Sequence, residues 1–167
     1  MNLAEAVKLK SILTSKFHEY TSELHRSAFI TVEKDQPPVT SNRTMEEIHT
    51  DLARVRKDIR TLDRLVYEAN VMNTVSFEDE SLTLVEAIEL ASQLRESAST
   101  YRSFGENEKE EVQHGYGDTV LYRIAQFDPA AYREKATQLE KQAHRLSNAI
   151  NAKNYSITID FDDSMYF

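Results

Sequence analysis

Residues 44–69 read TMEEIHTDLARVRKDIRTLDRLVYEA, and this stretch decides the fold class. Its apolar residues recur in alternating steps of three and four, which is the period of a coiled-coil seam. The first turn adds a capping box, because Thr44 and Glu47 each bind an amide that the helix leaves unpaired. The sequence therefore predicts a long amphipathic helix over 44–72. Its seam consists of Met45, Ile48, Leu52, Val55, Ile59, Leu62, Val66 and Ala69.

Three further helices are predicted from the same kind of periodicity. The first covers 2–27, and the next covers 83–104 and opens with a second capping box. The last begins at Pro129, where Asp128 is the expected N-cap and proline suits the first helical position. Only three glycines and three prolines occur in the 167 residues, so few turns interrupt these helices. The predicted fold class is mainly α, with four long helices forming two antiparallel helical hairpins.

Four segments rich in β-branched residues, with alternating polarity, predict short strands. Two follow the second and fourth helices, at 74–77 and 156–161, and two lie at the hairpin tips, at 28–32 and 120–125. Isolated short strands are not stable alone. We expect them to form a four-strand patch or to pair with strands of another subunit, which predicts a homo-oligomer.

The chain contains an internal similarity that indicates a duplication. Residues 2–13 align with 83–94 at an offset of 81, with six of twelve positions identical. Residues 74–79 align with 158–163 at an offset of 84, with three of six positions identical. Chance similarity between amphipathic helices is the alternative explanation, but the second match lies outside a helix.

We therefore expect a single domain over 1–167, built from one repeat at 1–80 and another at 81–167. Duplicated units are expected to keep similar core faces while their loops diverge. The segment 105–118, with its three glycines and its acidic run, has the character of an insertion in the second repeat.

Composition and charge exclude several classes of protein. The net charge of −8 argues against nucleic-acid binding, which needs a basic surface. No stretch approaches the roughly 20 apolar residues of a membrane-spanning helix, and the N-terminus lacks the apolar region of a secretory signal. The absence of cysteine excludes disulfides and thiolate metal sites. We expect a cytoplasmic protein that binds neither nucleic acid nor membranes.

No arrangement of residues in the sequence specifies an enzyme or a cofactor site. The five histidines form no His-x-x-x-His or His-Glu-x-x-His pair, which are common metal-binding spacings on helices. The sequence also has no phosphate-binding glycine loop and no nucleophile elbow. We therefore predict no catalytic residue, no cofactor and no enzymatic activity.

The loop over 105–118 is the main candidate site. It combines glycines, acidic residues and a histidine, which is typical either of a mobile acidic loop or of a metal or small-ligand site. The candidate metal ligands are His114, Glu110, Glu111 and Asp118. The C-terminal residues 164–167 end on two aromatic side chains, which either cap the core or dock on a neighbouring subunit.

Several short motifs along the chain are similar to those of a known protein family. They are the helix start Leu3-Ala4-Glu5-Ala6, the loop Val32-Glu33-x-x-x-Pro37, the helix start Thr83-Leu-x-Glu-Ala87 and the helix end Asn154-Tyr155. With these motifs the chain resembles small bacterial proteins labelled septicolysin-like. The resemblance implies a helical fold without an assigned activity. The lytic action that the label suggests is not expected, because the chain has no cysteine and no tryptophan.

These observations favour a non-enzymatic assembly or interaction protein. We expect it to self-associate through its coiled-coil seams and short edge strands, as a homo-oligomer or together with a protein partner. The alternative is a small-ligand or metal-binding protein, an enzyme included, that uses the acidic loop 105–118.

Overall fold

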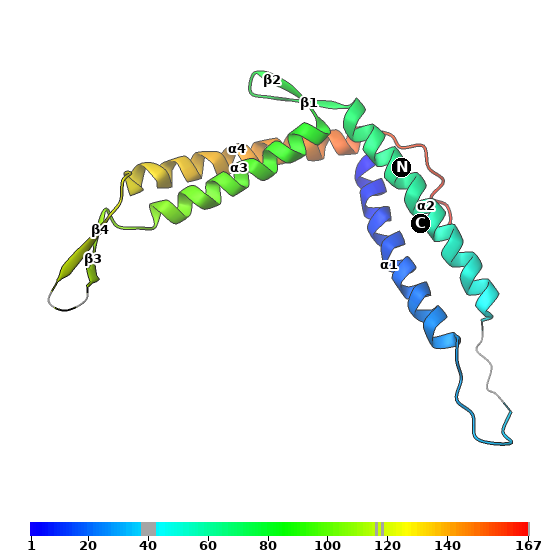
Figure 1. Ribbon diagram of the computed structural model, residues 1–167. Coiled ribbons are helices and arrows are strands. Elements are labelled where there is room, and N and C mark those ends of the chain that lie inside the picture. The colour runs from blue at the N-terminus through cyan, green and yellow to red at the C-terminus, as the bar shows by residue number, and fades with distance from the viewer. Residues whose placement is uncertain (38–42, 116, 118, 167) are drawn as a thin grey trace. The chain divides into compact units, whose positions relative to one another are not determined.

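The computed structural model describes residues 1–37, 43–115, 117 and 119–166, and it is mainly α (Figure 1). Four helices pack as α1·α2 and α3·α4 pairs and are accompanied by two small β-hairpins, so the predicted fold class is confirmed. The elements are α1 (Leu3–Ser27), α2 (Met45–Met72), β1 (Thr74–Phe77), β2 (Glu80–Thr83), α3 (Leu84–Gly105), β3 (Glu110–His114), β4 (Val120–Ile124) and α4 (Pro129–Ser156).

The chain divides into two compact units. Unit 1 comprises Met1–Asn70 and Asn154–Phe167, and it contains α1 and most of α2. Unit 2 comprises Val71–Lys153, and it contains both β-hairpins, α3 and most of α4.

The core of unit 1 uses the seam that the sequence predicts for α2. Six of the eight seam residues are buried within the unit, whereas Met45 is exposed and Ile59 is half-buried. Lys10, the one polar residue on the apolar stripe of α1, places its Nζ 2.5 Å from Oδ1 of Asp63 on α2. The hydrogen bond to Asp63 raises the pKa of Lys10. The buried residues are Leu3, Ala6, Leu9 and Leu13 of α1 and Ile48, Leu52, Val55, Leu62, Val66 and Ala69 of α2.

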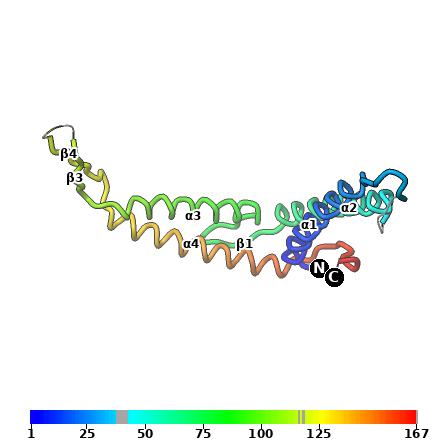
Figure 2. Tube along the Cα trace, turned by 90° about the horizontal axis from the view of Figure 1, so that it is seen from below, coloured from blue at the N-terminus to red at the C-terminus, as the bar shows by residue number. Residues whose placement is uncertain are grey.

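The C-terminal segment completes unit 1 beside the start of α1 (Figure 2). The amide of Leu3 donates to the carbonyl of Ile157 at 2.9 Å, and the amide of Ile159 donates to the carbonyl of Met1 at 2.9 Å. Both isoleucine side chains are buried. The prediction of a strand over 156–161 is wrong: α4 keeps its helical hydrogen bonds through Ser156, and beyond it only Thr158 forms a single bridge.

The core of unit 2 is built largely from alanine, which lets α3 and α4 approach closely. Gly105 at the end of α3 shows how close the approach is. A Cβ atom at this position would lie 3.0 Å from the backbone nitrogen of Arg133 on α4. The buried helix residues are Leu84, Ala87, Ala91, Ala98 and Gly105 of α3 and Pro129, Ala136, Ala143, Leu146 and Ile150 of α4.

The strands differ in part from the prediction. The predictions at 74–77 and 120–125 correspond to β1 and β4, whereas 28–32 forms no strand. Instead of a four-strand patch, the described residues form two separate two-stranded sheets, β1–β2 and β3–β4, both antiparallel. Each strand pairs with its neighbour in sequence because a short connection can turn the chain back on itself. The β1–β2 turn uses Glu78 at a φ of 52°.

Several local features recur at the offsets that the sequence similarity predicts. Helices α2 and α4 both have 28 residues and begin 84 positions apart. Helices α1 and α3 both start with a capping box, at Asn2 and Thr83. The amide of Leu84 donates to the carbonyl of Asn73 at 2.9 Å, as Leu3 does to Ile157. The duplication stays a prediction, and these features agree with it.

Candidate functional site

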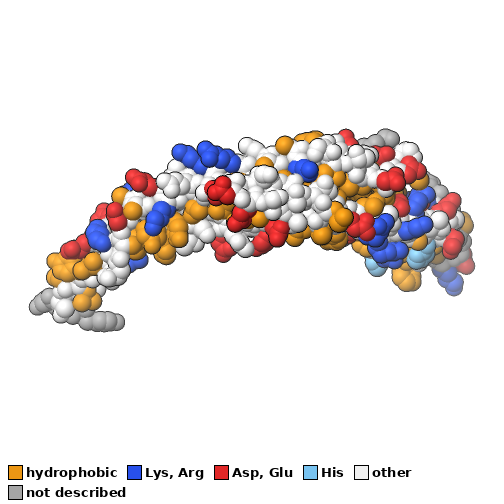
Figure 3. All heavy atoms as spheres, turned by 90° about the horizontal axis from the view of Figure 1, so that it is seen from above, with side chains coloured by type: hydrophobic (Ala, Val, Ile, Leu, Met, Phe, Trp, Pro, Cys, Tyr) orange, Lys and Arg blue, Asp and Glu red, His pale blue; other side chains and the backbone are white. Residues whose placement is uncertain are grey.

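The most exposed structured part of the described chain is the hairpin of β3 and β4, which we call the arm. Every residue of both strands is exposed. The register pairs Glu110 with Ile124, Val112 with Tyr122 and His114 with Val120. Because side chains alternate across a strand, these six residues share one face, and four of them are apolar. Figure 3 shows apolar side chains gathered over the arm at the left of the molecule.

The base of the arm is held on the α3·α4 pair by aromatic side chains. The ring of Phe104 at the end of α3 lies 5.3 Å from that of Phe127 and 5.7 Å from that of Tyr132 on α4, measured between centroids. Lys109 donates from Nζ to the carbonyls of Ala125 and Phe127, both at 2.8 Å. Aromatic contacts of this kind stabilise a structure by about 1 kcal/mol each beyond their burial. They therefore hold the base of the arm, which we call its root and which consists of Phe104, Phe127 and Tyr132, in place.

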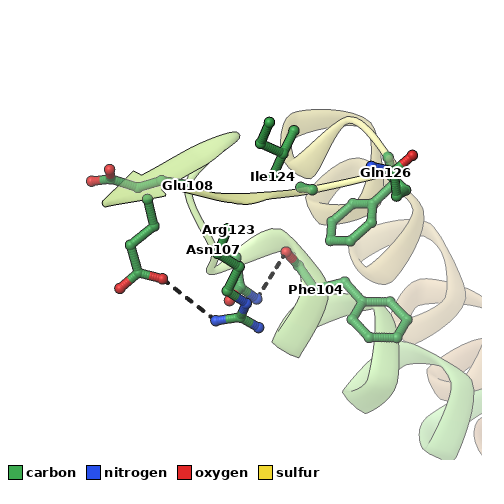
Figure 4. Close-up of a pocket in the computed structure, with 9 residues that line it drawn as sticks. Phe104, Asn107, Glu108, Arg123, Ile124 and Gln126 are labelled. Atoms are coloured by element: carbon green, nitrogen blue, oxygen red, sulfur yellow. Dashed lines mark hydrogen bonds and ion pairs between the residues drawn. The ribbon is translucent and has the colours of Figure 1, made fainter. Parts of the chain in front are cut away.

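A hollow of about 280 Å³ lies between this root and the first strand residues (Figure 4). Its wall is mainly apolar and includes Phe104, Phe127 and Ile124. The charged groups that line it are partly engaged, because Arg123 donates to Glu111 at 3.5 Å. The side chain of Asn107 donates back to the carbonyls of α3. Among the described residues, no side-chain nitrogen or oxygen of the wall is buried without a hydrogen-bond partner.

The arm separates the predicted metal ligands instead of bringing them together. Glu110 and His114 share a face but stand four residues apart on β3, which is about 13 Å along an extended strand. Glu111 is on the opposite face and forms an ion pair with Arg123, and Asp118 lies outside the described residues. Within the described part of the chain, no three His, Asp or Glu side chains are placed to hold one metal ion.

The C-terminal aromatic segment reaches unit 1 of its own chain. The hydroxyl of Tyr166 donates to Asp58 on α2, and the ammonium of Lys16 lies 5.4 Å from the centre of the tyrosine ring. Burial, together with this hydrogen bond, raises the pKa of Tyr166 to about 12. Tyr166 is therefore half-buried against unit 1 of its own chain. The choice between capping the core and docking on a neighbouring subunit stays a prediction, and Phe167 lies outside the described residues.

Sequence reasoning missed a second surface feature, an open groove of about 380 Å³ between α1 and α2. Its floor is apolar and its rim is cationic, since Arg56 and Arg60 stand four residues apart on one side of α2. The guanidinium of Arg56 lies 5.2 Å from the centre of the Phe17 ring. The spacing of the two arginines was the available signal, but its meaning depends on which face of α1 lies opposite. The groove is lined by Thr14, Phe17, His18, Arg56, Ile59 and Arg60.

Among the described residues, no helix combines the length and apolar character needed to cross a bilayer.

The fold and the exposed arm define a class: small, mainly α proteins built from two helical hairpins. A crystal structure described as that of a functionally unknown conserved protein from Corynebacterium diphtheriae is similar to this chain, with 23% sequence identity and a TM-score of 0.69. The match covers 96% of this chain and 99% of that one, and it shows the fold alone. The chain belongs to a family of unknown function, DUF6847, which matches residues 10–159. No curated protein matches the chain, and the septicolysin resemblance stays a prediction.

Proposed function

We propose that this chain is a non-enzymatic assembly module that self-associates through the arm. The observation that carries the proposal is that every residue of both arm strands is exposed, although one face bears Val112, Val120, Tyr122 and Ile124. Exposed apolar patches rimmed by polar residues are typical of interaction surfaces. A two-stranded hairpin is marginally stable in water, so contact with a partner would stabilise it.

The geometry favours the arm over the helical seams as the associating surface. Most of the α2 seam is buried within unit 1, as at Leu52 and Leu62. The outer edges of β3 and β4 leave backbone groups without a strand partner among the described residues. Edge strands of this kind pair readily with other chains unless charge or proline prevents it. Strand β4 contains no proline and only one charged residue, Arg123.

The test is the mass of the protein in solution as a function of concentration, measured by light scattering and sedimentation. We expect the wild-type mass to rise with concentration into the tens of micromolar. Val112→Ser combined with Tyr122→Ser should hold the protein at the monomer mass. Leu121→Ser is the matched control, because Leu121 lies on the opposite face of the arm. A wild-type protein that stays monomeric throughout would refute the proposal.

The hollow at the base of the arm favours one alternative function, the binding of a small apolar ligand. Its wall is mainly apolar, and Arg123 at its edge could pair with an acidic group on the ligand. A panel of short-chain carboxylates and divalent metal ions, tested for thermal stabilisation of the protein, distinguishes this alternative. Stabilisation that Phe127→Ala abolishes would favour ligand binding over assembly.

A further inference from the structure

The arm and the α1·α2 groove have complementary chemistry. The arm presents an apolar face, and Glu108 and Glu110 lie at its base. The groove presents an apolar floor with Arg56 and Arg60 on its rim. Figure 3 shows Lys and Arg side chains beside histidine and apolar side chains over the α1·α2 pair, at the right of the molecule. The two surfaces are therefore both apolar, and the charges beside them are of opposite sign.

None of these four charged side chains forms an ion pair among the described residues. The ion pairs of the described chain involve other arginines: Arg43, Arg54, Arg64, Arg102 and Arg123. The guanidinium of Arg56 lies over the ring of Phe17. In a chain with a net charge of −8, two adjacent unpaired arginines beside an apolar groove are an uncommon local excess of positive charge.

The spacing of the two charged pairs also matches. Arg56 and Arg60 are four residues apart on a helix, which corresponds to about 6 Å along its axis. Glu108 and Glu110 are two residues apart with a bend at Lys109 between them, so their backbones lie no more than about 7 Å apart. Two carboxylates of the arm can therefore face two guanidinium groups of the groove at the same time, and paired charges of this kind fix the register of a contact.

We propose that the arm of one copy of this chain docks in the α1·α2 groove of a second copy, with Glu108 and Glu110 facing Arg56 and Arg60. This inference rests on the proposed function and names the surface that receives the arm. Because arm and groove are different surfaces, the contact is heterologous. Such contacts join copies head to tail, into a closed ring or an open chain.

The test is a charge exchange in the full-length protein, read out by sedimentation. Arg56→Glu with Arg60→Glu reverses the groove, and Glu108→Arg with Glu110→Arg reverses the arm. We expect each double variant to weaken association by about tenfold or more, because like charges then meet across the contact. An equimolar mixture of the two should regain the wild-type association, since every arm then finds a groove of opposite charge. Lys141→Glu with Arg145→Glu is the matched control, with the same charge change at the same spacing on α4.

The outcomes separate this inference from the proposed function. One outcome is that the wild type associates, the combined Val112→Ser and Tyr122→Ser variant does not, and reversal of the groove charges has no effect. The arm then docks on another surface, and the inference is overturned. A mixture that stays as weak as its components would also overturn it. Unchanged circular dichroism in each variant shows that a lost association does not come from unfolding. A monomeric wild type refutes both proposals.

Discussion

Truncation of Leu146 to alanine tests how the two units are stabilised. Leu146 is fully buried in unit 2, where the described core otherwise relies mainly on alanine. Among the described residues of unit 2, Leu84 is the other large side chain with no exposed surface. Removal of a buried leucine side chain costs its transfer free energy and leaves a cavity, together about 3 kcal/mol. Helices that pack through alanine have little freedom to close that cavity.

The assay is hydrogen exchange followed by mass spectrometry, which reports on each unit separately. A loss of about 3 kcal/mol should speed exchange of the protected α3 and α4 amides roughly a hundredfold. Protection of α1 and of most of α2 should persist, because the core of unit 1 is made of other residues. Leu62→Ala, a change at an equally buried position of α2, should give the reverse pattern.

Leu139→Ala is the control within α4, because Leu139 is only half-buried and its loss should cost less. Two results would contradict the reasoning. An equal rise in exchange across both units would mean that they unfold as one body. A loss of less than about 1 kcal/mol would mean that α3 and α4 close the cavity.

Three further changes test other features. Gly105→Ala should destabilise unit 2 by about 1–3 kcal/mol in urea unfolding, because the new methyl group meets the backbone of Arg133; unchanged stability would show that α3 and α4 can move apart. Thr83→Ala removes the N-cap of α3 and should cost about 1 kcal/mol in the same measurement, whereas Thr83→Ser should restore it. The folded-state pKa of Tyr166 is raised from 10.0 to about 12, so its contribution to stability is full below pH 10 and is lost as the pH rises toward 12. Tyr166→Phe should remove this part of the pH dependence, and an unchanged alkaline profile would exclude the titration of Tyr166 as its source.

The helices could be predicted from the sequence because their signals are local. The period of the α2 seam and the capping residues at Thr44 and Thr83 depend only on neighbours within a few turns. The end of α4 shows where local signals fail. Residues 156–161 alternate like a strand, but a strand forms only where a second extended segment lies alongside, and the periodicity of one segment does not supply that partner.

The arm was predicted only in part for a similar reason. Val120–Ile124 is rich in β-branched and aromatic residues, whereas Glu110–His114 has a charged start that is typical of a loop. Strand β3 forms because its pairing partner, β4, lies close along the chain. Once it is a strand, its alternation places Glu110 and Glu111 on opposite faces. The groove between α1 and α2 depends on how the two helices pack against each other. It could therefore not be predicted from the sequence of either helix alone.

The pairing of the C-terminal segment with the start of α1 also determines the order in which the two units can fold during synthesis on the ribosome. Unit 2 is continuous in the chain, so it can fold as soon as Lys153 has emerged. Unit 1 begins first but needs Asn154–Phe167, which are synthesised after unit 2. Until then the carbonyl partner of Leu3 is absent, and the surface that Ile157 and Ile159 later cover stays open. We therefore expect unit 1, although its synthesis begins first, to finish folding after unit 2. In the interval, nascent chains depend on chaperones to keep them from associating.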